Sequence, residues 1–586
     1  MSADEQERPI HPWATDLTEE FFHADTEKQP GEDNMQIAGF DIQPHVFFIS
    51  TVLLIGFIVY SIVFPDDAGS RFGWLFNNIN ENFGWFYIIA ANVFIVAVLF
   101  FAVGKYGSIR LGGVDAEKEF SDTSWVAMLF SAGMGIGLMF WSVAEPVWHY
   151  MDPLFGVEGN SVAGAEVAMA VTYFHWGFHP WAIYGIVGLA LAFFAYNRGL
   201  PLTFRSVFWP ILGERIYGWW GHLVDILAIF ATLFGLATSL GLGAMQVNAG
   251  LEVVGEEILD ISVATGSVPQ AIIILAITAL AVVSVALGIH KGIRVLSNVN
   301  VGLMLLLMFS VLILGPTLFL LEFVPQSTGY YLQNLPELSL WTQATGAEGQ
   351  MGVYDGFQGF WTVFYWGWWI AWSPFVGMFI ARISRGRTVR EFVLGVLVLP
   401  VTFSFLFIGI LGGTGMHFEE FTGETIITDR MLADEAYAMF EMFHLMELTM
   451  ALSIVAIVLV VTFFVTSSDS GSLVLGHLSS GGKHSAPRNQ RIGWAIIEGA
   501  VAASLIFAGG EEALEALRTA SITAGLPFAV VLLFMCWAVW RGFQEEYRTL
   551  QSDEFALRLQ ELEETEDIVI KRTGEGVVTE VRDAEN

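Results

Sequence analysis

Cysteine and basic residues are scarce in this chain of 586 residues. The single cysteine, Cys536, lies in an apolar stretch, so one chain can form neither a disulfide nor a cysteine-ligated metal centre. Only 26 lysines and arginines stand against 59 acidic residues, and the net charge of −33 argues against nucleic acid as a partner. The first forty residues lack the apolar segment of a cleavable signal peptide. The apolar stretches also lack Ser-His-Asp, paired-histidine-plus-acid and phosphate-loop patterns, which argues against an enzyme.

Long apolar runs are abundant by contrast. Hydrophobic residues make up 54% of the sequence and gather in runs of about 20 residues, the length that crosses a bilayer as a helix. We count twelve runs, at residues 44–64, 83–104, 123–142, 168–195, 222–250, 265–287, 299–321, 359–381, 391–412, 447–468, 492–508 and 522–540. The sequence therefore predicts an all-α polytopic membrane protein with twelve transmembrane helices.

The few basic residues are unevenly distributed among the loops. Only Arg71, Arg430 and Arg518 fall in odd-numbered loops, and the other 23 of the 26 lie in even-numbered loops or in the tails. Because cytoplasmic loops retain lysine and arginine, both termini are predicted to be cytoplasmic. The acidic tails fit a saline habitat or an ordinary solvated tail equally well. On this count the membrane region holds no basic side chain, so an anionic substrate group there needs backbone N–H groups, hydroxyls or a bound metal ion.

The most distinctive stretch runs from Trp361 to Phe379 and carries five tryptophans within its first twelve residues. In a helix, one face carries a stripe of four rings, which come from Trp361, Tyr365, Trp368 and Trp372. Trp369 lies beside this stripe. Electron-rich indole faces attract cations, so the stripe predicts either an aromatic cage for an ammonium group or plain helix packing. Its position in the middle of the run, away from the interfacial aromatic belts, favours the cage. Pro374 removes a backbone hydrogen bond and predicts an interruption of this helix.

Three further stretches carry polar or flexible residues in the membrane region. Alternate glycines in the third run predict a broken helix that lines a cavity, with close helix packing as the alternative. The fourth run holds His175 and His179, which we interpret as structural, among further aromatic residues that can form a second wall of the cage. Hydroxyls in the fifth run and at residues 463–470 suit Na⁺, or else bond back to helix carbonyls.

Taken together, these motifs closely resemble the betaine/choline/carnitine transporter family over about residues 40–545. The resemblance is carried by Gly133-Met134-Gly135-Ile136-Gly137, His175-Trp176-Gly177, His179 to Tyr184, Trp361 to Pro374, and Arg382 to Thr388. It implies two extra helices followed by two LeuT-like inverted five-helix repeats, at about 123–321 and 359–540. The domain boundaries are then a cytoplasmic tail at 1–43, expected to be disordered, a transporter domain at 44–540, and a C-terminal helix and tail at 541–586, disordered beyond residue 567. It also implies a plasma-membrane location and a homotrimer.

The resemblance assigns roles to particular residues. Those implied to bind substrate are Trp176, Trp181, Tyr184, Trp368, Trp369, Trp372, Gly133, Met134, Gly135 and Gly137. Those implied to bind Na⁺ are Ser131, Met134, Phe463, Thr466 and Ser467. A second Na⁺ site of the family matches at Thr232 and Phe375, but Leu236 stands where its second threonine belongs, which puts a second ion in doubt.

The function implied is Na⁺ symport of a quaternary-ammonium compatible solute, with Na⁺ as coupling ion and no cofactor. Choline-transporting relatives tend to carry an aspartate where this chain has Gly137, so a zwitterion such as glycine betaine is favoured. Carnitine, ectoine, a sulfonium analogue and choline stay open as substrates. H⁺ coupling or exchange is the alternative mode, with His175, His179 and Glu498 as its candidate residues. A channel is the alternative of another class.

Overall fold

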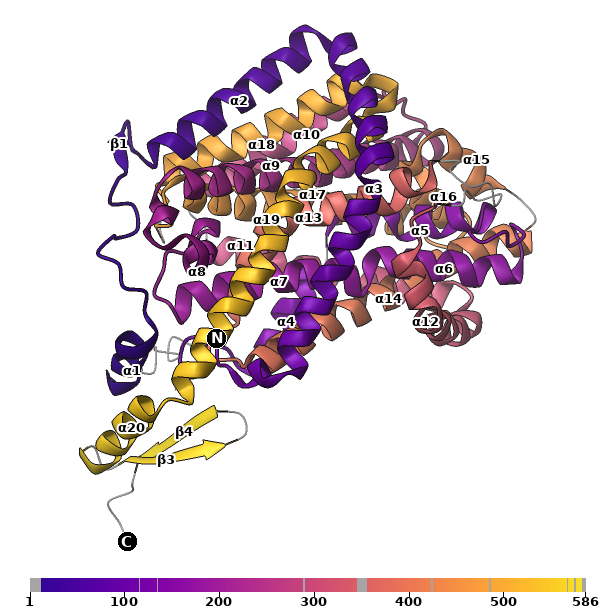
Figure 1. Ribbon diagram of the computed structural model, residues 1–586. Helices are drawn as coiled ribbons and strands as arrows, with labels where there is room; N and C mark the ends of the chain where they lie inside the picture. The colour runs from indigo at the N-terminus through magenta and orange to yellow at the C-terminus, as the bar shows by residue number, and fades with distance from the viewer. Residues whose placement is uncertain are drawn as a thin grey trace.

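The computed structural model describes residues 12–114, 116–133, 135–287, 290–344, 356–422, 425–483, 486–565, 568–573 and 576–581. Nearly all of this is helical, because backbone groups inside a bilayer must be satisfied within their own segment. Figure 1 shows the long helices crossing one another in one bundle, with short elements from both chain ends gathered at its lower left. The predicted all-α polytopic fold is confirmed.

The elements follow one another with short connections. The first half comprises α1 Pro12–Phe22, β1 Met35–Ile37, β2 Phe40–Ile42, α2 Pro44–Val63, α3 Pro65–Val103, η1 Lys105–Ser108, α4 Asp122–Gly133, α5 Ile136–Met151, α6 Val162–Trp176, α7 Phe178–Tyr196, η2 Phe204–Phe208, α8 Trp209–Leu212, η3 Gly213–Tyr217, α9 Trp219–Glu252, η4 Val253–Ile258 and α10 Ser267–Leu287. The second comprises α11 His290–Leu314, α12 Thr317–Leu340, η5 Gly359–Val363, α13 Phe364–Ile383, α14 Val389–Thr422, α15 Ile426–Ala433, η6 Glu435–Tyr437, α16 Ala438–His444, α17 Thr449–Ser479, α18 Arg488–Gly509, η7 Gly510–Glu512, α19 Ala513–Leu550, α20 Asp553–Thr565, β3 Ile568–Thr573 and β4 Gly576–Val581. The strands form two antiparallel hairpins, β1 with β2 and β3 with β4.

The number of membrane-crossing helices is less sharply defined. Among the described residues, nine segments are long and apolar enough to cross a membrane, and α4 with α5 adds a tenth as a bent pair. That count joins α18 and α19 in one segment and leaves out the tryptophan-rich α13. The figure of twelve therefore stays a prediction.

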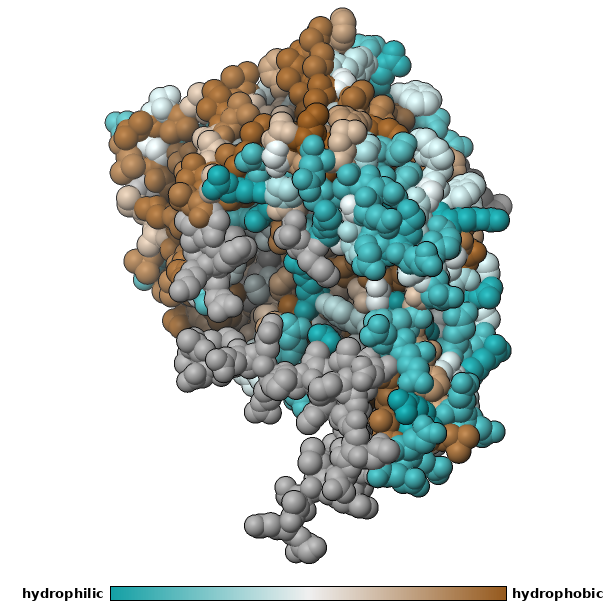
Figure 2. Space-filling view, turned by 90° about the vertical axis from the view of Figure 1, so that its left-hand side faces the viewer, coloured by the Kyte–Doolittle hydropathy of each residue, from teal (hydrophilic) through white to brown (hydrophobic). Residues whose placement is uncertain are grey.

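The surface separates apolar from polar regions. Exposed apolar side chains lie on α2, α3, α10 and α11, where Val52, Val103, Ile272 and Ile313 are each more than half exposed. Figure 2 shows the left-hand side of Figure 1, with apolar residues along its upper and left margins and a polar area over its right. Helices that expose apolar side chains in this way are stable when lipid covers them.

Basic loops and both chain ends meet at one end of the bundle. Arg198 pairs with Glu546 beyond the last predicted run, and Lys483 Nζ lies 2.6 Å from Asp41 Oδ2 before the first. Arg110 Nη1 donates to the carbonyl of Gly386 at 2.8 Å, which joins two further basic loops. This grouping is what the charge pattern requires, while the identity of this side as the cytoplasmic one stays a prediction.

The chain ends hold more structure than the sequence predicted. Leu17 and Phe22 of α1 are buried in a small apolar cluster with Phe555 of α20. The N-terminal segment was expected to be disordered, and over its described part this expectation was wrong. The expectation of disorder beyond residue 567 was also wrong for the described strands β3 and β4, which form a hairpin. Apolar side chains at helical spacing on α1 and α20 find partners in each other, which neither acidic segment reveals alone.

The helix α13 continues through Pro374, where an interruption was predicted. Pro374 cannot donate to the carbonyl of Ile370, four residues earlier, and the hydroxyl of Ser373 donates to that carbonyl at 2.7 Å instead. A hydroxyl that replaces the missing donor lets an apolar helix retain proline. The prediction of an interrupted eighth helix was therefore wrong.

Close packing of α9 against α13 depends on Gly235. A Cβ at Gly235 would lie 2.8 Å from the backbone nitrogen of Trp372. We expect Gly235→Ala to lower stability by about 1–3 kcal/mol, because the two backbones must separate. The measurement is the thermal unfolding midpoint of the detergent-purified protein.

Gly329 in α12 supplies the matched control. Among the described residues, and apart from the neighbouring backbone of its own helix, no heavy atom lies within 4 Å of the position of its added Cβ. Gly329→Ala is expected to leave the midpoint unchanged or to raise it, since alanine is the better helix former by up to about 1 kcal/mol. Equal midpoints for the two variants would contradict the packing argument.

Candidate substrate and cation site

The third predicted membrane helix is broken at its glycine run. The helix α4 ends at Gly133 and α5 begins at Ile136, and the segments Asp122–Ser131 and Ile136–Met151 form an angle of 61°. Gly135 between them is extended, with φ −176° and ψ −178°. Met134 lies outside the described residues. The predicted break is thus confirmed, and it leaves the first N–H groups of α5 without intrahelical partners.

Two glycines of this run face aromatic rings. A Cβ at Gly137 would lie 2.6 Å from Cη2 of Trp368 and 3.0 Å from Cη2 of Trp176, and one at Gly135 would lie 3.7 Å from Cη2 of Trp372. The absence of a side chain therefore lets the N-terminus of α5 approach the indoles directly. Anionic groups are stabilised at such a helix start.

The predicted cage residues come together from three helices. Trp176 at the end of α6 lies edge-on to Trp369 of α13, with ring centroids 4.9 Å apart. On the other side, Tyr184 of α7 is 6.3 Å from both Trp369 and Trp372, and Trp181 is 5.4 Å from Tyr184. The predicted stripe is present as well, because successive members from Trp361 to Trp372 are stacked with centroids 6.3–6.4 Å apart. The two aromatic walls of the hypothesis therefore face each other.

Hydrogen bonds fix the orientation of three of the indoles. Trp369 Nε1 donates to the carbonyl of His175 at 2.9 Å. Trp368 Nε1 lies 3.3 Å from both the carbonyl of Gly235 and Oγ of Ser239 on α9. Trp176 Nε1 donates to Glu145 Oε2 at 2.8 Å. Because their N–H edges are fixed, Trp368 and Trp369 are held in a stack at 4.6 Å, and Trp176 is held edge-on to both.

Two polar atoms of the cage have no hydrogen-bond partner among the described residues. They are Nε1 of Trp372 and the hydroxyl of Tyr184, both buried. Buried donors are rarely left unpaired in proteins. A ligand with an acceptor group, such as a carboxylate, would satisfy them.

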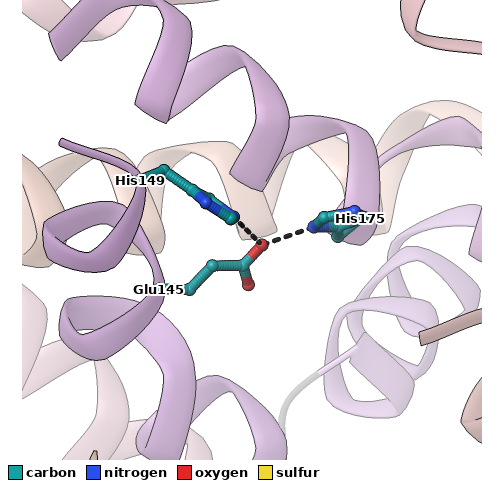
Figure 3. Close-up of side chains that lie close together, drawn as sticks. All are labelled: Glu145, His149 and His175. Atoms are coloured by element: carbon teal, nitrogen blue, oxygen red, sulfur yellow. Dashed lines mark hydrogen bonds and ion pairs between the residues drawn. The ribbon is translucent and has the colours of Figure 1, made fainter. Parts of the chain in front are cut away.

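Behind the cage lies a fully buried carboxylate, Glu145 of α5 (Figure 3). Its Oε1 is 2.6 Å from His175 Nδ1 and 3.5 Å from His149 Nε2. Its Oε2 accepts hydrogen bonds from Trp176 and from the hydroxyl of Tyr365. His175 Nε2 lies 3.0 Å from Oγ1 of Thr362. Glu145 therefore joins α5, α6 and α13 directly beneath the indole of Trp176.

This cluster has the composition of a metal site, with one carboxylate and two histidines whose ligand atoms all lie within 4.8 Å. However, two ligands each about 2.0–2.1 Å from one tetrahedral ion lie more than about 3 Å apart. The 2.6 Å between Glu145 Oε1 and His175 Nδ1 is the length of a charge-assisted hydrogen bond instead. The structural interpretation of His175 fits, but the expectation that no His-plus-acid group lies in the membrane region was wrong.

The residues implied to bind Na⁺ line a cavity of about 210 Å³ next to the cage. Ser131, Phe463, Thr466 and Ser467 share this cavity with Trp372, and it reaches Arg382 near the end of α13. Thr466 Oγ1 donates its proton to a carbonyl of its own helix and accepts from Nδ2 of Asn300 at 3.5 Å, which leaves one hydroxyl lone pair free to coordinate a cation. The structure thus brings four of the five residues together, and their role in binding Na⁺ stays a prediction.

The second Na⁺ site is only partly assembled. Phe375 lines the cavity, but the hydroxyl of Thr232 donates to the carbonyl of Ala228 at 2.7 Å, and Thr232 is not among the cavity-lining residues. The side chain of Leu236 instead approaches Gly471 of α17, 2.3 Å from the position that a Cβ would occupy there. An apolar side chain therefore takes the place of the missing oxygen ligand.

The candidate residues for proton coupling are all buried but lie apart. His179 Nε2 is 3.4 Å from Oδ1 of Asn92 on α3. Glu498 accepts a hydrogen bond from Ser468 at 2.9 Å, next to the proposed cation residues, while its Oε1 has no partner among the described residues. Glu498 is therefore the better placed of the two for exchange with the cavity.

Two buried charged side chains, Glu145 and Arg518, escaped the sequence analysis because of helix boundaries. Glu145 was placed beyond a run that ended at residue 142, whereas α5 continues to Met151. Arg518 was placed in a loop, whereas it lies in the second turn of α19 and is 1% exposed. Arg518 is therefore a buried basic side chain, and the statement that the membrane region holds none stays a prediction.

Comparison with known proteins agrees with the geometry. The sequence matches the betaine/carnitine/choline family of transporters over residues 45–548. It is 47% identical over 529 residues to glycine betaine transporter 1 of Vibrio parahaemolyticus, covering 89% of this chain and 97% of the relative. A glycine betaine/proline/choline/ectoine transporter of the same organism is 43% identical over 528 residues (89% and 91% covered). A probable glycine betaine transporter of Desulfitobacterium hafniense is 39% identical over 505 residues (86% and 98%). The helix break before α5 lies against the aromatic cage, and the sequence matches extend along nearly the whole chain. The chain therefore belongs to the betaine/carnitine/choline transporter family and is a multi-pass membrane transporter rather than an enzyme.

Proposed function

We propose that this transporter imports a zwitterionic quaternary-ammonium solute, glycine betaine first, by symport with Na⁺. The observation that carries the proposal is the edge-on contact of Trp176 with Trp369, whose ring centroids are 4.9 Å apart, beside the start of α5. The cationic end of the substrate lies against the indole faces, which favours it by about 2 kcal/mol where water is excluded. Its carboxylate meets the free N–H groups of α5.

A zwitterion fits this site better than a simple cation. At Gly137 the rings of Trp368 and Trp176 fill the space that a side chain would need, so this position carries no acid to balance a lone positive charge. A substrate with its own carboxylate is neutral overall and needs no such partner. Relatives named for proline, choline and ectoine transport show the range within which the substrate is sought.

The cation cavity supports Na⁺ as the coupling ion. Its oxygen-bearing residues adjoin Trp372, so a bound cation and the substrate share one wall. Hard cations prefer carbonyl and hydroxyl oxygens of this kind. Because Leu236 removes one ligand of the second site, the proposal is for one Na⁺ per substrate. Alternating access, a plasma-membrane location, cytoplasmic termini and a homotrimer belong to the same proposal.

The test is uptake of labelled glycine betaine into proteoliposomes that contain the purified protein. We expect saturable uptake driven by an inward Na⁺ gradient and none when K⁺ replaces Na⁺. Ser467→Ala is expected to raise the half-saturating Na⁺ concentration about tenfold, the effect of losing about 1.4 kcal/mol of ligand interaction.

Ser470 provides the control within the same cavity, since it lines the wall one turn further along α17. Ser470→Ala is expected to keep the Na⁺ dependence of the unmodified protein. Uptake that is independent of Na⁺ and driven by a pH gradient would overturn Na⁺ symport. Glu498 would then be the candidate residue for H⁺ coupling. If glycine betaine supported less counterflow than carnitine, ectoine or choline, the assignment of glycine betaine as the first substrate would be overturned.

A further inference from the structure

Arg518 is a buried cation that the transport site described above does not use. It lies in α19 and its guanidinium stacks on Phe360, with Cζ 3.5 Å from the ring centroid. Phe364, Trp141 and Trp361 surround it at 5.2, 5.5 and 5.6 Å. The four rings come from η5, α13 and α5, so the guanidinium occupies an aromatic box between three elements.

This box continues into the cage. Trp361 stacks with Tyr365 at 6.4 Å, and Phe364 stacks with Trp368 at 5.5 Å. Phe360 and Arg382 lie at opposite ends of the η5–α13 segment, which at about 1.5 Å per residue separates them by about 33 Å. Arg518 therefore lies on the side of the cage opposite to the cavity that reaches Arg382.

Within the described part of the chain no carboxylate forms an ion pair with the guanidinium, and Glu435, Glu515 and Glu145 act on it only through the longer-range attraction of their charges. Neither Nε nor Nη2 finds a hydrogen-bond acceptor there, and Nε1 of Trp141 is a third buried donor in the same state. Nε–H and one N–H of Nη2 point in the same direction, and this edge of arginine binds the two oxygens of a carboxylate.

Burying an arginine in this way has a high desolvation free energy unless an anion binds to it. Arginine does not lose its proton in proteins, so burial leaves a full positive charge that water no longer solvates. The aromatic faces offset part of this cost. They accept no hydrogen bond of ordinary strength, so the bidentate edge stays unsatisfied until a carboxylate reaches it.

We propose that Arg518 is the carboxylate-recognising residue of an outer substrate site, where a zwitterionic ammonium compound binds before it enters the cage. The acid end pairs with Nε and Nη2, and the ammonium end lies on the ring of Trp361. This inference rests on the proposed function, and it adds a residue that selects zwitterions over cations. Choline differs from glycine betaine by carrying a hydroxyl in place of the carboxylate, so it makes no ion pair with Arg518.

The experiment measures selectivity with Arg518→Gln and Arg518→Lys. Inhibition of labelled glycine betaine uptake by unlabelled betaine and by choline gives a ratio of half-inhibitory concentrations, choline over betaine. We expect Arg518→Gln to lower this ratio at least tenfold, by weakening betaine and not choline. Arg518→Lys, which keeps the charge but loses the planar fork, is expected to give an intermediate ratio.

Arg205 is the matched control, because it is also buried but is paired with Asp225. Arg205→Gln is expected to reduce the amount of folded transporter and to leave the ratio unchanged. If both Arg518 variants kept a choline-over-betaine ratio within twofold of the unmodified protein, the inference would be overturned. Arg518 would then be a residue that only packs against the surrounding aromatic rings. Absence of betaine uptake by the unmodified protein would overturn the proposed function itself, and the inference with it.

Discussion

Trp369→Ala is expected to abolish measurable uptake while the protein still folds. The indole of Trp369 is 2% exposed, stacks on Trp368 at 4.6 Å and meets Trp176 edge-on at 4.9 Å. Its removal deletes the central face of the cage, worth about 2 kcal/mol toward a desolvated ammonium group, and loosens the two neighbouring rings. Together these losses predict a rise of at least about a hundredfold in the dissociation constant for glycine betaine, since each tenfold step corresponds to about 1.4 kcal/mol.

The measurement is substrate binding by tryptophan fluorescence or calorimetry, with uptake as a second readout. Trp369→Phe keeps an aromatic face but loses the hydrogen bond to the carbonyl of His175, so an intermediate affinity is expected. Trp366 is the control on the same helix, because it is fully buried against His179 and Phe174 and away from the cage. Trp366→Phe should bind betaine normally. Normal affinity in Trp369→Ala would remove the cage from the proposal.

The aromatic cage was predictable because periodicity alone places its stripe on one helix face. Helical spacing put Trp361, Tyr365, Trp368 and Trp372 in line, and the structure stacks them in that order. The glycine run was equally informative, because three alternate glycines leave a helix weak wherever it lies. Local sequence patterns of this kind survive into the fold since they depend on residues only a turn apart.

Features that depend on a particular side-chain hydrogen bond or on a distant partner could not be predicted in this way. Pro374 indicates a broken helix until Ser373 is seen to donate to the carbonyl that proline leaves free. The acidic chain ends look disordered until Phe22 and Phe555 are found in contact. The first case depends on a hydroxyl next to the proline and the second on a contact between the two chain ends, and no hydropathy pattern records either.

The charged groups around the cage show a second limit. Apolar runs were ended at the first polar residues, so Glu145 and Arg518 fell just outside them. Both side chains are buried, and hydrogen bonds or aromatic faces replace water around the charge. Ionisable residues at the edge of an apolar run therefore merit inspection as site residues, since the membrane makes them expensive unless they have a role.

Glu145→Leu is expected to eliminate high-affinity binding, whereas Glu145→Gln is expected to keep it. Leucine leaves the donors of Trp176, Tyr365 and His175 without their common acceptor, and each unsatisfied buried group costs about 1–3 kcal/mol. The indole of Trp176 is then free to leave its place in the cage. We expect a loss of at least about a hundredfold in betaine affinity or of most folded protein, measured by binding and by size-exclusion chromatography.

Glutamine can satisfy the same partners without a charge. Its carbonyl accepts from Trp176 and Tyr365, and its N–H donates to His175 Nδ1 once that ring carries its proton on Nε2, which then donates to Thr362. Betaine affinity within about tenfold of the unmodified protein is therefore expected. His149 is the control, because its Nε2 lies 3.5 Å from Oε1 without a hydrogen bond, so His149→Phe should have little effect. If Glu145→Gln were as inactive as Glu145→Leu, the negative charge itself would be required, and Glu145 would become a proton carrier rather than a support for the cage.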